Sequence, residues 1–153
     1  MEYDYKRKKI VAVLASNLDV GVALNVVGHM AVSLGAHCPD RDLMGRNPLV
    51  DATGNSHVGI AKYPFIITKV KQGKLRRVLE SARKTPGIFI IDYPSQMLST
   101  GHDDELGEAI AGTREEQINY LGILLYGDRP QLEELTGRFT LWRSESGVTE
   151  DAE

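Results

Sequence analysis

Residues 9–35 read KIVAVLASNLDVGVALNVVGHMAVSLG, and this stretch decides the fold. The run from Ile10 to Leu14 is apolar and mostly β-branched, which is typical of a strand covered on both faces. A polar turn at 16–19 follows, and Gly35 is a helix stop signal. Between them, apolar residues recur at helical spacing: Leu24, Val27, Ala31 and Leu34. The stretch therefore predicts a buried strand, a turn and a long helix.

Short apolar runs and helical patterns alternate along the rest of the chain. Further strands are predicted at 65–67, 88–91 and 120–126, with an edge strand at 139–142, and further helices at 73–84, 103–110 and 129–136. We therefore expect a single three-layer α/β domain over residues 9–143. Its four- or five-stranded, mostly parallel mixed sheet carries helices on both faces. A basic extension (1–8) precedes the domain, and an acidic tail (144–153), which we expect to be disordered, follows it.

Composition excludes several classes of protein. The 153 residues carry 18 Lys and Arg against 21 Asp and Glu, and a net charge of −3 argues against a dedicated nucleic-acid binder. The single cysteine, Cys38, excludes an internal disulfide and fits a reducing cytoplasm, where we expect the protein to reside. No apolar run approaches the roughly 20 residues of a membrane span, so we expect no membrane association.

The chain offers few reactive side chains. Its four histidines lie in four separate segments without helical pair spacing, so we expect neither a metal nor another cofactor. Cys38 follows His37, which allows a reactive thiolate, although a cysteine in a loop is usually unreactive. Two irregular regions, 36–57 and 95–116, have the length of functional or mobile loops and could close over a ligand.

Asp92 is the strongest candidate for chemistry. It ends an apolar strand, and ligands of open α/β sheets bind outside strand ends. Alternatively, its carboxylate binds backbone N–H groups of the following turn. The helix start from Asp19 to Gly21 presents free N–H groups that could hold an anion or a carbonyl oxygen. The alternative there is simple helix capping by Asp19.

Residues 9–35 resemble the opening of the type II peptidyl-tRNA hydrolases, where a strand leads through Asp-Leu and Gly-Lys into a helix with Ala-Ala-Gln-Cys-x-His. Gly21 and His29 match that family's Gly and His. Near the end, residues 119–122, 127–130 and 135–137 resemble its Thr-Val-Leu-Gly, Gly-Pro-Gly-Pro and Val-Thr-Gly segments. The resemblance covers most of residues 9–143 and implies the same fold.

The departures from that family concern its catalytic candidates, which are a Lys, an Asp and two Thr residues. At the matching positions this chain has Val22, Asp92, Gln96 and Asn119, so only the Asp is retained. A valine cannot supply the positive charge that holds a phosphate or a developing oxyanion. We therefore expect neither peptidyl-tRNA hydrolysis nor tRNA as a partner.

The sequence is more closely similar to the family called domain of unknown function 2000. The opening of that family also runs from a buried strand through Asp-Leu-x-x-Gly into a helix rich in Ala and Asn. This resemblance implies the same fold and accounts for the missing Lys, but it implies no activity.

Two functions remain open. In the favoured one, the protein binds a small ligand without catalysis in a cleft at the strand ends, with these binding residues: Asp19, Gly21, Asn25, Gln96 and Asn119. In the alternative, it hydrolyses a small amide or ester, with Asp92 as general base activating water while Asn25, Gln96 or Asn119 orients the substrate. A strongly raised pKa for Asp92 beside Asn119 would favour the enzyme, whereas backbone hydrogen bonds to Asp92 would favour the binder. A homodimer is also expected, paired through the edge strand at 139–142, unless Trp142 packs on its own domain.

Overall fold

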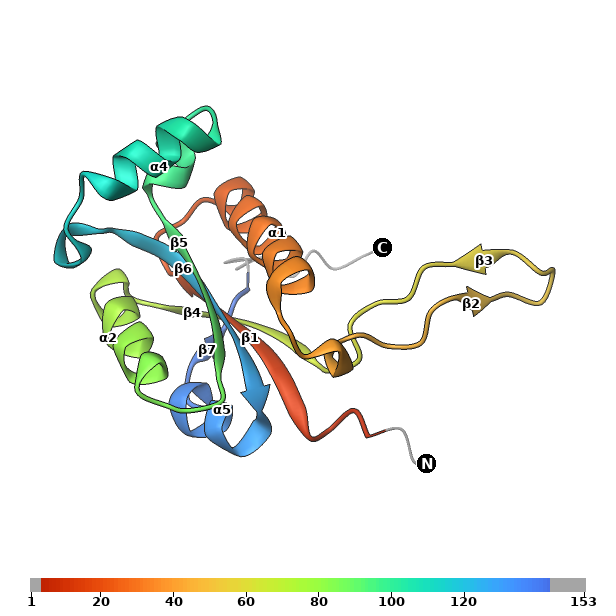
Figure 1. The fold of residues 1–153 in the computed structure, drawn as a ribbon. Coiled ribbons are helices and arrows are strands. Elements are labelled where there is room, and N and C mark those ends of the chain that lie inside the picture. The colour runs from red at the N-terminus through yellow and green to blue at the C-terminus, as the bar shows by residue number, and fades with distance from the viewer. Residues whose placement is uncertain (1–3, 144–153) are drawn as a thin grey trace, which may run out of the picture.

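A five-stranded sheet forms the centre of the protein in this computed structural model, which describes residues 4–143 (Figure 1). The strand order is β5-β6-β1-β4-β7. The strands are β1 (Lys8–Ala15), β4 (Phe65–Val70), β5 (Phe89–Pro94), β6 (Tyr120–Asp128) and β7 (Thr140–Leu141). Each predicted strand is therefore present, and β1 begins at Lys8, one residue before the predicted domain start.

The predicted parallel character of the sheet is wrong. Only β1 and β4 run parallel, whereas β6 is antiparallel to both β1 and β5, and β7 is antiparallel to β4. The cause of the error is that a strand covered on both faces is apolar throughout, whichever direction its neighbours run. The sheet is thus mixed, with a single parallel pair.

Helices cover both faces of this sheet (Figure 1). On one face lies α1 (Val20–His37), and on the other lie α2 (Gln72–Arg83) and α5 (Arg129–Thr136). The helix predicted at 73–84 is confirmed as α2, and its four inner residues are all buried: Leu75, Val78, Leu79 and Ala82. One apolar cluster fills each face, and the central strands β1 and β6 contribute to both.

Helix α1 carries apolar side chains on its exposed side as well as on its buried side. Its inward residues pack in the core at a spacing of three or four: Ala23, Val26, Met30 and Leu34. On the opposite side, Leu24 is 66 % exposed and Val32 is 73 % exposed. Among residues 4–143 it is the one helix that is long and apolar enough to cross a membrane by length and composition alone. The expectation that no segment approaches this threshold was therefore wrong, and α1 also continues two residues beyond Gly35.

Both predicted irregular regions contain secondary structure. The first holds a short 3-10 helix (Arg41–Leu43) and a two-stranded hairpin that projects from the body, formed by β2 (Leu49–Val50) and β3 (Ser56–His57) (Figure 1). The second holds α3 (Gln96–Ser99), α4 (Asp103–Ala111) and a 3-10 helix (Glu115–Gln117). The helix predicted at 103–110 is confirmed. The predicted acidic tail, 144–153, lies outside the described residues.

Gly122 in β6 lies where α1 packs closely on the sheet. A Cβ atom there would lie 2.9 Å from Leu14 Cδ2 and 3.0 Å from Val26 Cγ1. We expect Gly122→Ala to lower the free energy of unfolding by about 1–3 kcal/mol, because the added methyl overpacks the core. In the matched control Gly35→Ala, no atom lies within 4 Å of the new Cβ, and better helix propensity should raise stability by up to about 1 kcal/mol. Urea denaturation measures both, and changes of the same sign would contradict the packing argument.

Candidate functional site

The carboxyl ends of β1, β4 and β5 lie at the same edge of the sheet, together with the amino end of β6. Four of the predicted binding residues flank these strand ends. Asp19 and Gly21 follow β1, Gln96 follows β5, and Asn119 precedes β6. All four residues thus adjoin this edge of the sheet, but the side chains of Gln96 and Asn119 bond to different partners, Thr113 and Gln72.

The side chain of Asn119 is held by an amide chain that sequence reasoning did not find. Gln72, the first residue of α2, donates a hydrogen bond from Nε2 to Asn119 Oδ1, and Asn17 Nδ2 donates to Gln72 Oε1 at 3.1 Å. The carbonyl oxygen of Asn119 accepts a hydrogen bond from Ser95 N–H at 2.8 Å. Asn119 therefore connects β6 to α2, and its amide oxygen bonds to Gln72.

The start of α1 is exposed to solvent. Asp19 stands at the N-cap position, and its carbonyl oxygen accepts a hydrogen bond from the N–H of Ala23 at 2.9 Å. Its carboxylate makes no capping hydrogen bond, so the alternative of side-chain capping is wrong. Gly21 is exposed, and a Cβ atom there would meet nothing within 4 Å. Binding of an anion or a carbonyl group at this helix start stays a prediction.

Asp92 lies in β5 with its side chain 35 % exposed and its Oδ2 atom 4.0 Å from Arg83 NH2. Within residues 4–143 its carboxylate accepts no backbone hydrogen bond, so the alternative of a turn cap is also wrong. Burial raises the pKa of Asp92 above its ordinary value, Arg83 opposes this effect, and Glu115 adds to it. The carboxylate is thus free to accept a proton or a hydrogen bond, and its charged partner is Arg83.

Asn25 and Tyr93 line a groove of about 1200 Å³, here called the α1 groove, between α1, the end of β5 and the segment of α3 and α4. Asp92 also borders this groove, but its carboxylate lies beside Arg83 of α2, on the other side of the sheet. Tyr93 donates a hydrogen bond from its hydroxyl to Asn25 Oδ1 at 3.3 Å, and the ring centroids of His29 and Tyr93 are 6.3 Å apart. The exposed apolar side chains in the lining include Leu24, Met97 and Leu98. Asp19, Gly21, Gln96 and Asn119 do not line this groove.

Gln96 lies beside the groove at the start of α3. Its Nε2 atom is 3.4 Å from Thr113 Oγ1, to which it donates a weak hydrogen bond. Its Oε1 atom is buried and has no hydrogen-bond partner in the described part of the chain. A buried acceptor without a hydrogen bond destabilises the folded state, so the surrounding structure must hold the Gln96 side chain in this position.

Tyr93 and His29 are the functional candidates that sequence reasoning missed. The sequence indicates His29 only as a family match and as one of four separate histidines, and Tyr93 is the neighbour of Asp92 in the Asp-Tyr-Pro segment. Cys38 is 3 % exposed in the core beside α1, where a thiol acts as a small apolar group. Among the described residues, no three His, Cys, Asp or Glu side chains come together as metal ligands would.

The raised pKa of Asp92 predicts a pH-dependent effect of Asp92→Asn. Because the pKa of this carboxyl is higher in the folded protein, its contribution to stability is complete below pH 3.8 and is lost as the pH rises through the folded pKa. We expect Asp92→Asn to raise Tm at pH 7 and to leave it unchanged at pH 3, while Arg83 keeps its ion pair with Glu115. Calorimetry at both pH values checks this, with the exposed Glu80→Gln as control. A lower Tm at pH 7 would show that the Arg83 ion pair outweighs burial.

Comparison with known proteins gives a fold and a family. The structure is similar to that of Atu0240, a protein of unknown function from Agrobacterium tumefaciens strain C58, with a TM-score of 0.78 and 23 % sequence identity. The alignment covers 90 % of this chain and 98 % of that chain, and at this identity it shows the fold alone. No curated protein matches the sequence. The model of the family DUF2000, described as a protein of unknown function, matches residues 8–143, and the chain therefore belongs to the DUF2000 family.

Proposed function

We propose that the protein binds a small, partly apolar ligand in the α1 groove. The observation that carries this proposal is the convergence of Asn25, His29 and Tyr93 in a groove that also has apolar walls. Binding sites for small molecules combine an apolar lining with a few polar groups that fix the orientation of the ligand. The groove adjoins the carboxyl end of β5, as expected for a ligand site in an open α/β sheet.

The polar groups of the groove determine which ligands fit. Asn25 accepts the Tyr93 hydroxyl at Oδ1, and its Nδ2 atom makes no hydrogen bond in the described part of the chain. His29 is exposed and adds ring nitrogens that donate or accept. A ligand with a hydrogen-bond acceptor for Asn25 and an apolar portion against Leu24 and Leu98 matches this lining.

The alternative function is hydrolysis of a small amide or ester with Asp92 as general base. It is favoured by the raised pKa of Asp92 and by a carboxylate free of backbone hydrogen bonds. It is opposed by the position of Asn119, whose amide oxygen bonds to Gln72. In this alternative, water activated by Asp92 is the nucleophile. Binding without catalysis is therefore the better-supported function, and the likeness to type II peptidyl-tRNA hydrolases stays a prediction.

A thermal-shift screen with metabolites, nucleotides and short acyl-amino acids tests the binding proposal. A ligand at 100 times its Kd stabilises the folded state by about 2.7 kcal/mol. We expect Asn25→Ala and Tyr93→Phe to weaken the binding of any such ligand about three- to tenfold, because each removes one hydrogen-bonding group. Ser81→Ala, on the exposed side of α2, is the control. A ligand whose Kd is unchanged in both groove variants would place its site elsewhere.

Turnover distinguishes the two functions. Each ligand that binds is incubated with the protein, and hydrolysis products are measured by mass spectrometry. Without catalysis no product accumulates. Product formation that Asp92→Asn abolishes, while ligand binding is retained, would establish the hydrolase instead.

Self-association through β7 stays a prediction. This strand has two residues, and Leu141 is 44 % exposed at the edge of the sheet. Trp142 donates its backbone N–H to Ile67 O at 2.9 Å, and its side chain packs against the core on the α1 side. Trp142 thus packs on its own domain, and pairing with a second chain would depend on the exposed edge at Leu141. Light scattering after size exclusion measures the molar mass.

A further inference from the structure

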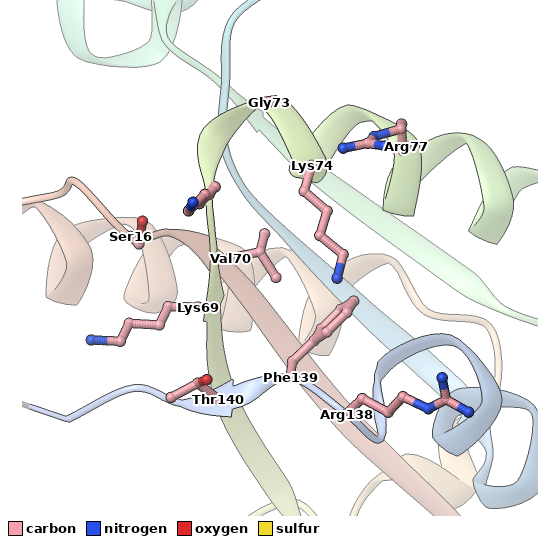
Figure 2. Close-up of a pocket in the computed structure, with 10 residues that line it drawn as sticks. Ser16, Lys69, Val70, Gly73, Lys74, Arg77, Arg138, Phe139 and Thr140 are labelled. Atoms are coloured by element: carbon pink, nitrogen blue, oxygen red, sulfur yellow. The ribbon is translucent and has the colours of Figure 1, made fainter.

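A pocket at the carboxyl ends of β1 and β4 is lined by five cationic residues. These are Lys69, Lys71, Lys74, Arg77 and Arg138. Figure 2 labels all of them except Lys71. The pocket, here called the basic pocket, has a volume of about 720 Å³, and no Asp or Glu lines it. We propose that the basic pocket binds a small molecule that carries two or more phosphate groups.

The cations of this pocket have no anionic partners within residues 4–143. Several other cations in the described part of the chain are paired. On the same helix, Arg76 and Arg83 form ion pairs with Glu115 at 2.8 and 3.0 Å, and near the N-terminus Lys8 pairs with Asp40. Lys69, Lys71, Lys74, Arg77 and Arg138 form no such pair. Uncompensated positive charge in a hollow attracts anions, and it is notable in a chain whose net charge is −3.

The fold brings these cations together from three segments. Lys69 and Lys71 lie at the end of β4, and Lys74 and Arg77 are three residues apart on α2, so they share one side of that helix. Thr140 pairs with Lys69 in the ladder between β4 and β7, which brings the preceding Arg138 to the same place. The pocket is therefore built at the ends of paired strands and the start of a helix, and the turn before β7 contributes Arg138 and Phe139.

Phe139 organises the centre of the pocket. The Lys74 ammonium lies 4.8 Å from the centroid of its ring, which is a cation–π distance. Figure 2 shows the Lys74 side chain reaching toward the Phe139 ring. Phe139 itself packs against the apolar cluster on the α2 side of the sheet. The contact holds the Lys74 side chain toward the hollow, where it remains available to a ligand.

The number and kind of donors indicate the ligand class. A single carboxylate needs one or two cations, whereas Lys74, Arg77 and Arg138, with Lys71 and the hydroxyls of Ser16 and Thr140 at the rim, match several phosphate oxygens. Guanidinium groups such as Arg77 bind phosphate in a bidentate manner. The amino end of α2 adds positive potential at the same place. The volume lies in the range of small-molecule sites, and the charge is confined to a hollow, so we assign a small molecule and not a nucleic acid.

The basic pocket shares no lining residue with the α1 groove, so each proposal is tested separately. Titration calorimetry of the full chain with tripolyphosphate tests the basic pocket directly. We expect saturable binding to one site, weakened as salt is added, because the attraction is between charges. Lys74→Ala or Arg77→Ala should raise the Kd about tenfold or more, the effect of losing a hydrogen bond to a charged group.

Lys84→Ala is the matched control, because it removes one lysine from the other end of α2, outside the basic pocket. We expect it to change the Kd by no more than about twofold, since its charge is screened over that distance. All three positions are exposed, and equal Tm values would show that the variants fold. Equal losses in Lys74→Ala and Lys84→Ala, or no saturable binding of tripolyphosphate, would overturn the proposal. Citrate binding as tightly would overturn the phosphate assignment, and single-stranded RNA binding more tightly would overturn the small-molecule assignment.

Discussion

The antiparallel pairing of β1 with β6 is the interaction on which the rest of the structure depends. The ladder runs from Lys8 opposite Asp128 to Leu14 opposite Gly122, and both strands are buried on both faces along most of their length. The remaining strands attach to this pair, β5 to β6 and β4 to β1, with β7 outside β4. Because Gly122 has no side chain, α1 can lie directly on the pair. The strand ends that border both hollows are therefore placed by this one ladder.

The two hollows lie at opposite ends of the strand order and differ in chemistry. The α1 groove adjoins β5 and presents an amide, an imidazole and a phenol among apolar side chains. The basic pocket adjoins β4 and β7 and presents ammonium and guanidinium groups. Such different linings select different ligands, so one small sheet has room for two independent recognition events.

Sequence reasoning located the elements well because their signals are local. The four inner residues of α2 recur at helical spacing, and the apolar run of β1 has no polar interruption. The direction of β6 could not be read, since it is set by which strands β6 lies between, and its burial pattern is the same for either direction. The sequence placed Asp92 at the end of a strand, but it could not show that Asp92 lies close to Arg83. In the sequence, Lys74 and Arg77 have the pattern of cations on the solvent-exposed side of a helix. Arg138 lines the same pocket but lies 61 residues after Arg77, so the sequence does not link the three residues.

The central position of β6 also governs how the chain acquires its structure during synthesis. The strands β1, β4 and β5 all leave the ribosome before it, yet β1 and β5 meet only through β6. Until residues 120–128 are available, one side of β1 and the partnered side of β5 present open backbone hydrogen-bonding groups and apolar faces. Contacts between residues so far apart in sequence close late and slowly. We therefore expect nascent chains that lack β6 to aggregate more readily than the full chain.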